Sequence, residues 1–150
     1  MNRLISSILI LSMCAPLVQA GNPDEISAIK KTALDYMESW YEGDADRMKS
    51  SLHKKLAKRS LKGLYGEPTM RHTTASDMIL FTRQGYGKSL WRKGQKIEVI
   101  ILDHYKNIAS VLVVAPHYHE YLHLGKIEDK WLILNALYEN KPTAIGDPND

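Results

Sequence analysis

The stretch Tyr118–Glu139, YHEYLHLGKIEDKWLILNALYE, contains two strand-like runs on either side of a short polar break at Glu128-Asp129. A two-residue turn at this break predicts an antiparallel hairpin, with Lys126 opposite Trp131 and the pairing continuing in step from there. Apolar residues fall on both faces of this hairpin. We therefore expect it to be covered on both sides.

The same register assigns the polar side chains of the hairpin to its two faces. Leu122 lies opposite Asn135, so Glu120 and Asn135 share one mostly apolar face, while Tyr121 and His123 share the other. Polar groups on buried faces need partners, either from the protein or from a ligand. These side chains are therefore the first candidates for a binding site.

Residues 1–20 have the pattern of a secretory signal peptide. Leu4–Leu17 is almost wholly apolar, and small residues precede a cleavage position after Ala20. We expect export to the periplasm and no stable membrane insertion after cleavage. A lipoprotein that uses Cys14 is one alternative, disfavoured because the large Met13 precedes that cysteine. An uncleaved membrane anchor is the other.

The composition of the chain excludes several functional classes. The 150 residues carry a formal charge of +3, which is too small to indicate nucleic-acid binding. The only cysteine lies in the signal segment, so the mature chain has no disulfide or thiolate chemistry. No serine elbow or phosphate-binding glycine loop is present, and we expect no cofactor.

We expect one domain over residues 21–140 and a loose tail over residues 141–150.

The first part of the chain is helical in pattern. Asn22 caps a long amphipathic helix that Gly43 ends, and Asp44 caps a second, shorter helix. Thr74 and Asp77 form a capping-box pattern that begins a third helix.

The basic segment Leu52–Ser60 lies between the second and third helices. Leu52 and Leu56 anchor it to the core. We expect the three lysines of the segment to be solvated. These are Lys54, Lys55 and Lys58.

From Gln95 onward the pattern becomes strand-like. Ile97–Leu102 alternates, Lys106-Asn107 is a plausible turn, and Ile108–Ala115 is β-branched and apolar. With the hairpin this gives a four-strand antiparallel meander. The predicted fold class is α+β, with a long N-terminal helix and short helices packed on a curved antiparallel sheet that encloses a cone-shaped cavity.

Two kinds of chemistry are open for the polar residues of this region. His117, His119 and His123 recur at strand spacing, which is compatible with a metal site completed by His104 or Glu120. Because His-x-His alone is a weak signal, we do not assign a metal.

Glu120 near Asn135 is the second option, as an acid–base carboxylate of raised pKa. A structural hydrogen-bond network is the preferred interpretation of this carboxylate, since no second catalytic partner occurs at fixed spacing.

Five stretches carry a resemblance to a known family: Ala33–Asp44, Leu52–Arg59, Ile101–Ala109, Glu120–Lys126 and Trp131–Asn135. Together they resemble the putative lumazine-binding family of the nuclear transport factor 2-like (SnoaL-like) superfamily. The resemblance runs from about Glu25 to Glu139. It implies a cone-shaped fold with a pocket between sheet and helices, and homodimers formed through the sheet.

The resemblance also selects individual positions. The residues that fall on the family pattern are Trp40, Gly43, His53, Arg59, Tyr121, His123, Trp131 and Asn135. Glu120 stands where aspartate is common, Lys54 replaces a usual proline, and Lys106 or Asn107 replaces a usual turn glycine. The superfamily includes enzymes and non-catalytic binding domains, so the fold does not fix the function.

We therefore predict a domain that binds a small apolar or aromatic molecule in its cone and does not catalyse a reaction. The predicted ligand-binding residues are Tyr36, Trp40, His53, Arg59, Glu120, Tyr121, His123 and Asn135. One alternative is a cofactor-free isomerase or dehydratase that uses Glu120 with His123 or His53. The other is metal binding through His117, His119 and His123.

Overall fold

The computed structural model describes residues 23–62 and 68–142. The predicted signal segment, residues 1–20, and residues 143–150 of the predicted tail lie outside the described residues. None of the described helices is long and apolar enough to span a membrane.

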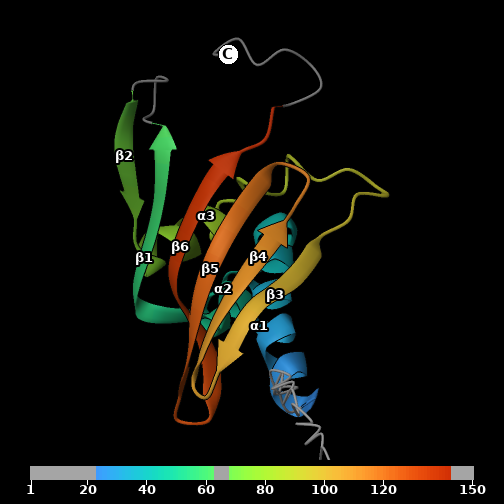
Figure 1. Cartoon of the computed structure of the whole chain (residues 1–150). Helices are drawn as coiled ribbons and strands as arrows, with labels where there is room; N and C mark the ends of the chain where they lie inside the picture. Colours follow the sequence, from blue (N-terminus) through green and yellow to red (C-terminus); the bar gives the residue numbers. More distant parts are fainter. Residues whose placement is uncertain (1–22, 63–67, 143–150) are drawn as a thin grey trace, which may run out of the picture.

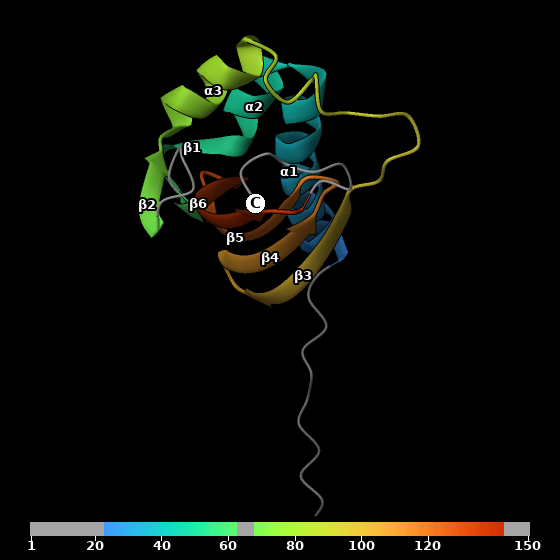
Figure 2. The same ribbon diagram turned by 90° about the horizontal axis from the view of Figure 1, so that it is seen from above.

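The helices and strands form two layers. The helices are α1 (Pro23–Glu42), α2 (Ala45–Ser51) and α3 (Ala75–Arg83). The strands are β1 (Leu52–Lys62), β2 (Pro68–Thr73), β3 (Glu98–Tyr105), β4 (Ile108–Val114), β5 (Tyr118–Ile127) and β6 (Lys130–Asn140). The sheet order is β2-β1-β6-β5-β4-β3, and the helices cover one face of the curved sheet (Figures 1 and 2). The predicted α+β class is confirmed.

Local sequence signals set three of the helix ends as predicted, whereas Asn22, the predicted cap of the first helix, lies outside the described residues. Gly43 adopts a φ of 74°, which ends α1. The Asp44 side chain then accepts a hydrogen bond of 2.9 Å from the Arg47 amide and begins α2. Thr74 and Asp77 form the reciprocal capping box of α3, with bonds of 2.9 and 3.2 Å.

The core lies between α1 and the inner face of the sheet. Its fully buried members include Ile29, Ala33 and Met37 from α1, and Val111, Leu122 and Ile133 from β4, β5 and β6. The spacing of the α1 residues places them on one helical face, and the strand residues alternate with less buried neighbours. The burial of this one face holds α1 across the sheet.

The predicted four-strand meander is confirmed, and two further strands extend the sheet. β1 pairs in parallel with β6, and β2 pairs antiparallel with β1, so the sheet is mixed rather than antiparallel. The inward positions of β1 include Lys58 and Ser60, and these polar residues break the alternation that marks a strand. The prediction that Lys58 is solvated is wrong, because only 5% of this residue is exposed.

The predicted hairpin register is correct near the turn and wrong beyond it. Leu124 faces Ile133 as expected, but a β-bulge at Leu134 shifts the next pair to His123 and Asn135. A one-residue shift moves a side chain to the other face of a sheet. Asn135 therefore shares the outer face with His123, whereas Glu120 faces inward opposite Tyr138.

The turn between β3 and β4 contains backbone strain that can be tested. Lys106 has a φ of 50°, in the left-handed region, whereas its neighbour Asn107 does not have a positive φ. Replacing Lys106 with glycine relieves a cost of about 1 kcal/mol, partly offset by the greater freedom of glycine in the unfolded chain. We predict that Lys106→Gly raises the free energy of unfolding, measured by urea denaturation.

The matched control for this prediction is Asn107→Gly in the same turn. This change is expected to leave stability unchanged or to lower it, because no strain is relieved. Equal effects of the two substitutions would contradict the assignment of strain to Lys106.

Candidate functional site

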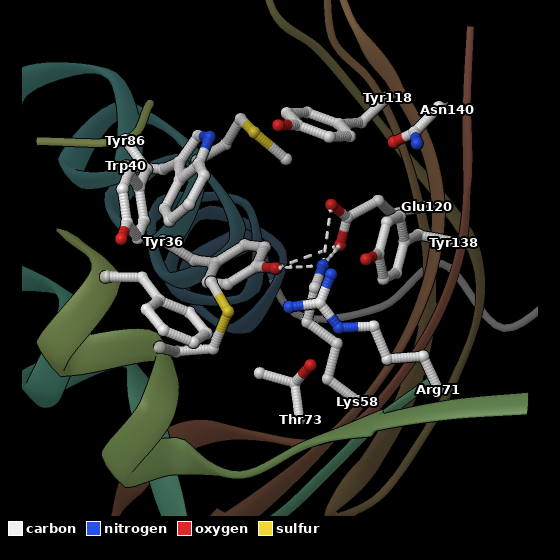
Figure 3. Close-up of a pocket in the computed structure, with 13 residues that line it drawn as sticks. Tyr36, Trp40, Lys58, Arg71, Thr73, Tyr86, Tyr118, Glu120, Tyr138 and Asn140 are labelled. Carbon is white, nitrogen blue, oxygen red and sulfur yellow. Dashed lines mark hydrogen bonds and ion pairs between the residues drawn. The ribbon is translucent and has the colours of Figure 1, made fainter. Parts of the chain in front are cut away.

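A cavity of about 390 Å³ opens between the helices and the inner face of the sheet (Figure 3). Its volume lies within the range typical of small-molecule sites. Side chains from α1, α3, β1, β2, β5 and β6 meet there. The lining residues are Tyr36, Met37, Trp40, Lys58, Arg71, Thr73, Met78, Phe81, Tyr86, Tyr118, Glu120, Tyr138 and Asn140.

Three of these side chains form a closed hydrogen-bonded triad. Lys58 Nζ lies 2.8 Å from both carboxylate oxygens of Glu120. It also donates to the Tyr36 hydroxyl at 2.7 Å, and that hydroxyl donates to Glu120 Oε2 at 2.9 Å. Each polar atom of the triad therefore has a partner inside the protein (Figure 3).

The sheet topology brings the triad together from segments far apart in the sequence. β6 separates β1 from β5, and at this level it carries Ala136, the partner of Lys58 in the parallel pair. The small alanine leaves the lysine stem room to cross toward Glu120. The ammonium group then lies 3.8 Å from the centre of the Tyr138 ring, in a cation–π contact.

Burial governs the protonation of Lys58 and Tyr36. It lowers the pKa of Lys58, and the attraction of Glu120 only partly opposes this effect. Burial, followed by the charge of Glu120, raises the pKa of Tyr36 well above its ordinary value. Tyr36 is therefore a neutral phenol near pH 7, and its hydroxyl donates a hydrogen bond to the carboxylate.

Aromatic rings line much of the rest of the cavity. Phe81 and Tyr86 have ring centres 5.5 Å apart, and Trp40 and Tyr118 contact edge to face at 6.4 Å. Burial raises the pKa of Tyr118 to about 12, so its hydroxyl also stays protonated. The backbone of Gly87 packs directly on the Trp40 indole, and an added Cβ would lie 2.6 Å from its Nε1. This close approach fixes the position of the indole in the cavity wall.

The predicted ligand-binding residues divide between the two faces of the sheet. Tyr36, Trp40 and Glu120 line the cavity. His53, at the start of β1, lies outside the lining, and its Nδ1 accepts a hydrogen bond of 3.2 Å from the Lys55 amide. The predicted residues therefore do not form a single pocket.

The other four predicted residues lie on the outer face. Arg59 donates to Asn135 Oδ1 at 2.9 Å, and the Asn135 amide lies 3.2 Å from His123 Nδ1. Tyr121 is nearby on the same face and is 47% exposed. The sheet thus separates His123 from Glu120, so these two cannot act together on one substrate. The structure contradicts the proposed acid–base pair.

The cavity also contains residues that the sequence reasoning missed, chiefly Lys58 and Arg71. The one signal for Lys58 was its position between Leu56 and Ser60, at the inward spacing of a strand. Arg71 had no such signal, because β2 itself was not predicted.

The structure does not support the predicted metal alternative. Within residues 23–62 and 68–142, no three His, Cys, Asp or Glu side chains are placed to hold one metal ion. His117 instead packs against the rings of Tyr41 and Tyr118, at centre distances of 6.2 and 6.3 Å. Burial lowers the pKa of this histidine.

Comparison with protein families supplies the identification. A model of the family described as putative lumazine-binding matches residues 24–139, which is most of the chain. The chain belongs to this putative lumazine-binding family. The match begins within α1 and ends one residue before the end of β6. No curated protein matches the sequence.

Solved structures agree with the fold of this putative lumazine-binding domain. A nuclear transport factor 2-like protein of unknown function from Methylobacillus flagellatus has a TM-score of 0.64 at 18% identity, covering 81% of this chain and 95% of that one. A similar protein from Silicibacter pomeroyi has a TM-score of 0.62 at 14% identity, covering 79% and 97%.

A ketosteroid isomerase-like protein from Erwinia carotovora atroseptica has a TM-score of 0.59 at 12% identity, covering 81% and 100%. At these identities the likeness concerns the fold alone. The cone-shaped nuclear transport factor 2-like fold is therefore confirmed.

The buried ion pair generates a stability prediction. Lys58→Met leaves Glu120 buried without its cation, and Glu120→Leu leaves Lys58 without its anion. Each single change is expected to lower the free energy of unfolding by about 3 kcal/mol. The double variant is expected to lose clearly less than the sum, because it leaves no unpaired charge.

Lys54→Met is the matched control, an exposed lysine on the same strand that should change stability by less than about 0.5 kcal/mol. Urea denaturation of the four variants measures the coupling. Additive losses in the double variant would mean that Lys58 and Glu120 do not interact in the folded protein.

Proposed function

We propose that this domain binds a small apolar or aromatic molecule in its cone cavity and does not catalyse a reaction. The observation that carries the proposal is the lining of the cavity. A wall of aromatic rings faces Lys58 and Glu120, whose opposite charges neutralise each other. Flat apolar molecules stack well on such walls. The volume of about 390 Å³ suits a ligand of two or three fused rings.

The state of Glu120 supports binding over catalysis. A general base needs a lone pair directed at the substrate. Both carboxylate oxygens of Glu120 accept hydrogen bonds from Lys58, and one also accepts from Tyr36. Three of the four lone-pair sites of this carboxylate are therefore already used within the protein, and proton abstraction from a ligand would compete with the bonds of the triad.

A neutral fluorescent probe tests the cavity as a binding site. N-phenyl-1-naphthylamine is apolar, and its emission rises on transfer from water to an apolar site. We predict saturable binding to the protein, and a loss of affinity of about tenfold or more in Thr73→Phe, whose ring would fill the cavity from β2.

Thr69→Phe provides the matched control, since it introduces the same ring at an exposed position of the same strand. It should leave the affinity unchanged. Undiminished binding to Thr73→Phe would place the probe outside the cavity and would contradict the proposal.

We also propose that the protein is exported after cleavage at Ala20 and forms a homodimer through the outer face of the sheet. The signal pattern of residues 1–20 supports export. Apolar side chains on the outer face support dimerisation, because 47% of Tyr121 and 43% of Leu137 remain exposed in the single chain.

Native mass spectrometry of the protein from the periplasmic fraction tests both statements. The expected species is a dimer whose chains begin at Gly21. A monomer, or chains that retain residues 1–20, would contradict the corresponding statement.

A further inference from the structure

We propose that the ligand of this cavity carries one anionic group, held by Arg71, on a flat apolar body. The inference rests on the proposed function and specifies its ligand class as an aromatic or polycyclic monoacid. It comes from the balance of charge in the cavity and from the opposite placement of its cationic and aromatic parts.

The charge balance of the cavity is the first argument. Among the described residues that line it, the charged side chains are Lys58, Arg71 and Glu120. Lys58 and Glu120 neutralise each other at 2.8 Å. Arg71 remains as one positive charge without a counterion in the lining. A ligand with a single negative charge makes the cavity neutral, whereas a cationic ligand adds to its excess charge.

The second argument is the lack of a partner for Arg71. No hydrogen bond or ion pair joins its guanidinium to any other side chain within the described part of the chain. Its charge acts on Asp77, but that carboxylate already accepts bonds of 2.7 and 2.9 Å from the hydroxyl and amide of Thr74. Burial is the main cause of the lowered pKa of Lys58, and the charge of Arg71 adds to it, because the two cations repel each other. An anion near Arg71 relieves this repulsion.

The third argument is geometric. Arg71 lies opposite Ser60 in the β1–β2 pair, and its side chain extends into the cavity toward the triad (Figure 3). A guanidinium presents parallel N–H donors that match the two oxygens of a carboxylate or sulfonate. Thr73 follows on the same face of β2 and adds a hydroxyl to this part of the lining.

The aromatic residues lie on the other side of the same space. Trp40 and Tyr86 face Arg71 across the cavity in Figure 3, and Phe81 completes this wall from α3. Tyr86 is 57% exposed, which places it where the cavity meets solvent. A ligand with its acid group toward β2 and its rings toward α1 and α3 satisfies both parts of the lining.

Two probes that share one ring skeleton test whether the cavity prefers an anionic ligand. 8-Anilinonaphthalene-1-sulfonate and N-phenyl-1-naphthylamine have the same ring system, and only the first carries a sulfonate. We expect the anionic probe to bind more tightly to the wild-type protein. Arg71→Gln should weaken its binding at least tenfold, since a charge-assisted hydrogen bond is lost, and should leave the neutral probe unchanged. Arg71→Lys keeps the positive charge but loses the parallel N–H donors of the guanidinium. It should retain part of the preference for the anionic probe.

Arg59→Gln is the matched control, an arginine of the same sheet whose side chain lies on the outer face. It should leave the affinity of both probes unchanged, and an effect there would show that the anionic probe binds the outer face instead. Equal affinity of the two probes for the wild-type protein, or equal effects of Arg71→Gln on both, would overturn the inference while leaving cavity binding intact. Binding of neither probe would overturn the proposed function itself.

Discussion

The ion pair between Lys58 and Glu120 is the interaction on which the cavity depends. Both side chains are almost fully buried, with 7% and 2% of their surfaces exposed. Removing two charges from water is expensive, and the expense is offset only when the pair is close and its remaining polar atoms are bonded. Tyr36 and the Tyr138 ring meet that requirement. The pair also joins β1 to β5 across β6, and so helps to hold β1 in its place in the sheet.

The two faces of the sheet carry separate groups of polar residues, and the bulge at Leu134 places Asn135 in the outer group. Inside the cone lie Glu120 and the aromatic wall. On the outer face, the hydrogen-bonded side chains of Arg59, Asn135 and His123 link β1, β6 and β5. The inner group faces a cavity and the outer group faces a partly apolar surface. This separation fits the proposals that the inner group binds a ligand and that the outer group contacts a second copy of the chain.

The sequence predicted most of the fold because its signals were local. Caps at Asp44 and Thr74, the turn at Glu128-Asp129 and the apolar periodicity of the strands each act within a few residues. The cavity was harder to predict because it depends on contacts between distant segments. The sequence indicated a solvated Lys58, because nothing local shows its partner Glu120, which lies on the far side of β6. The bulge was invisible for the same reason, since no turn or glycine marks Leu134, and it moved Asn135 to the other face.

The most direct test of this account is the NMR titration of the Lys58 ammonium group, observed through its ¹⁵Nζ resonance and assigned by its absence in Lys58→Met. A buried, ion-paired ammonium should exchange slowly with water and show contacts to the Tyr36 and Tyr138 rings. Its pKa should lie below the ordinary lysine value of 10.5, because burial disfavours the charged form. A lysine that exchanges rapidly and titrates at 10.5 or above would contradict the account, since it would place Lys58 in solvent and leave Glu120 without its partner.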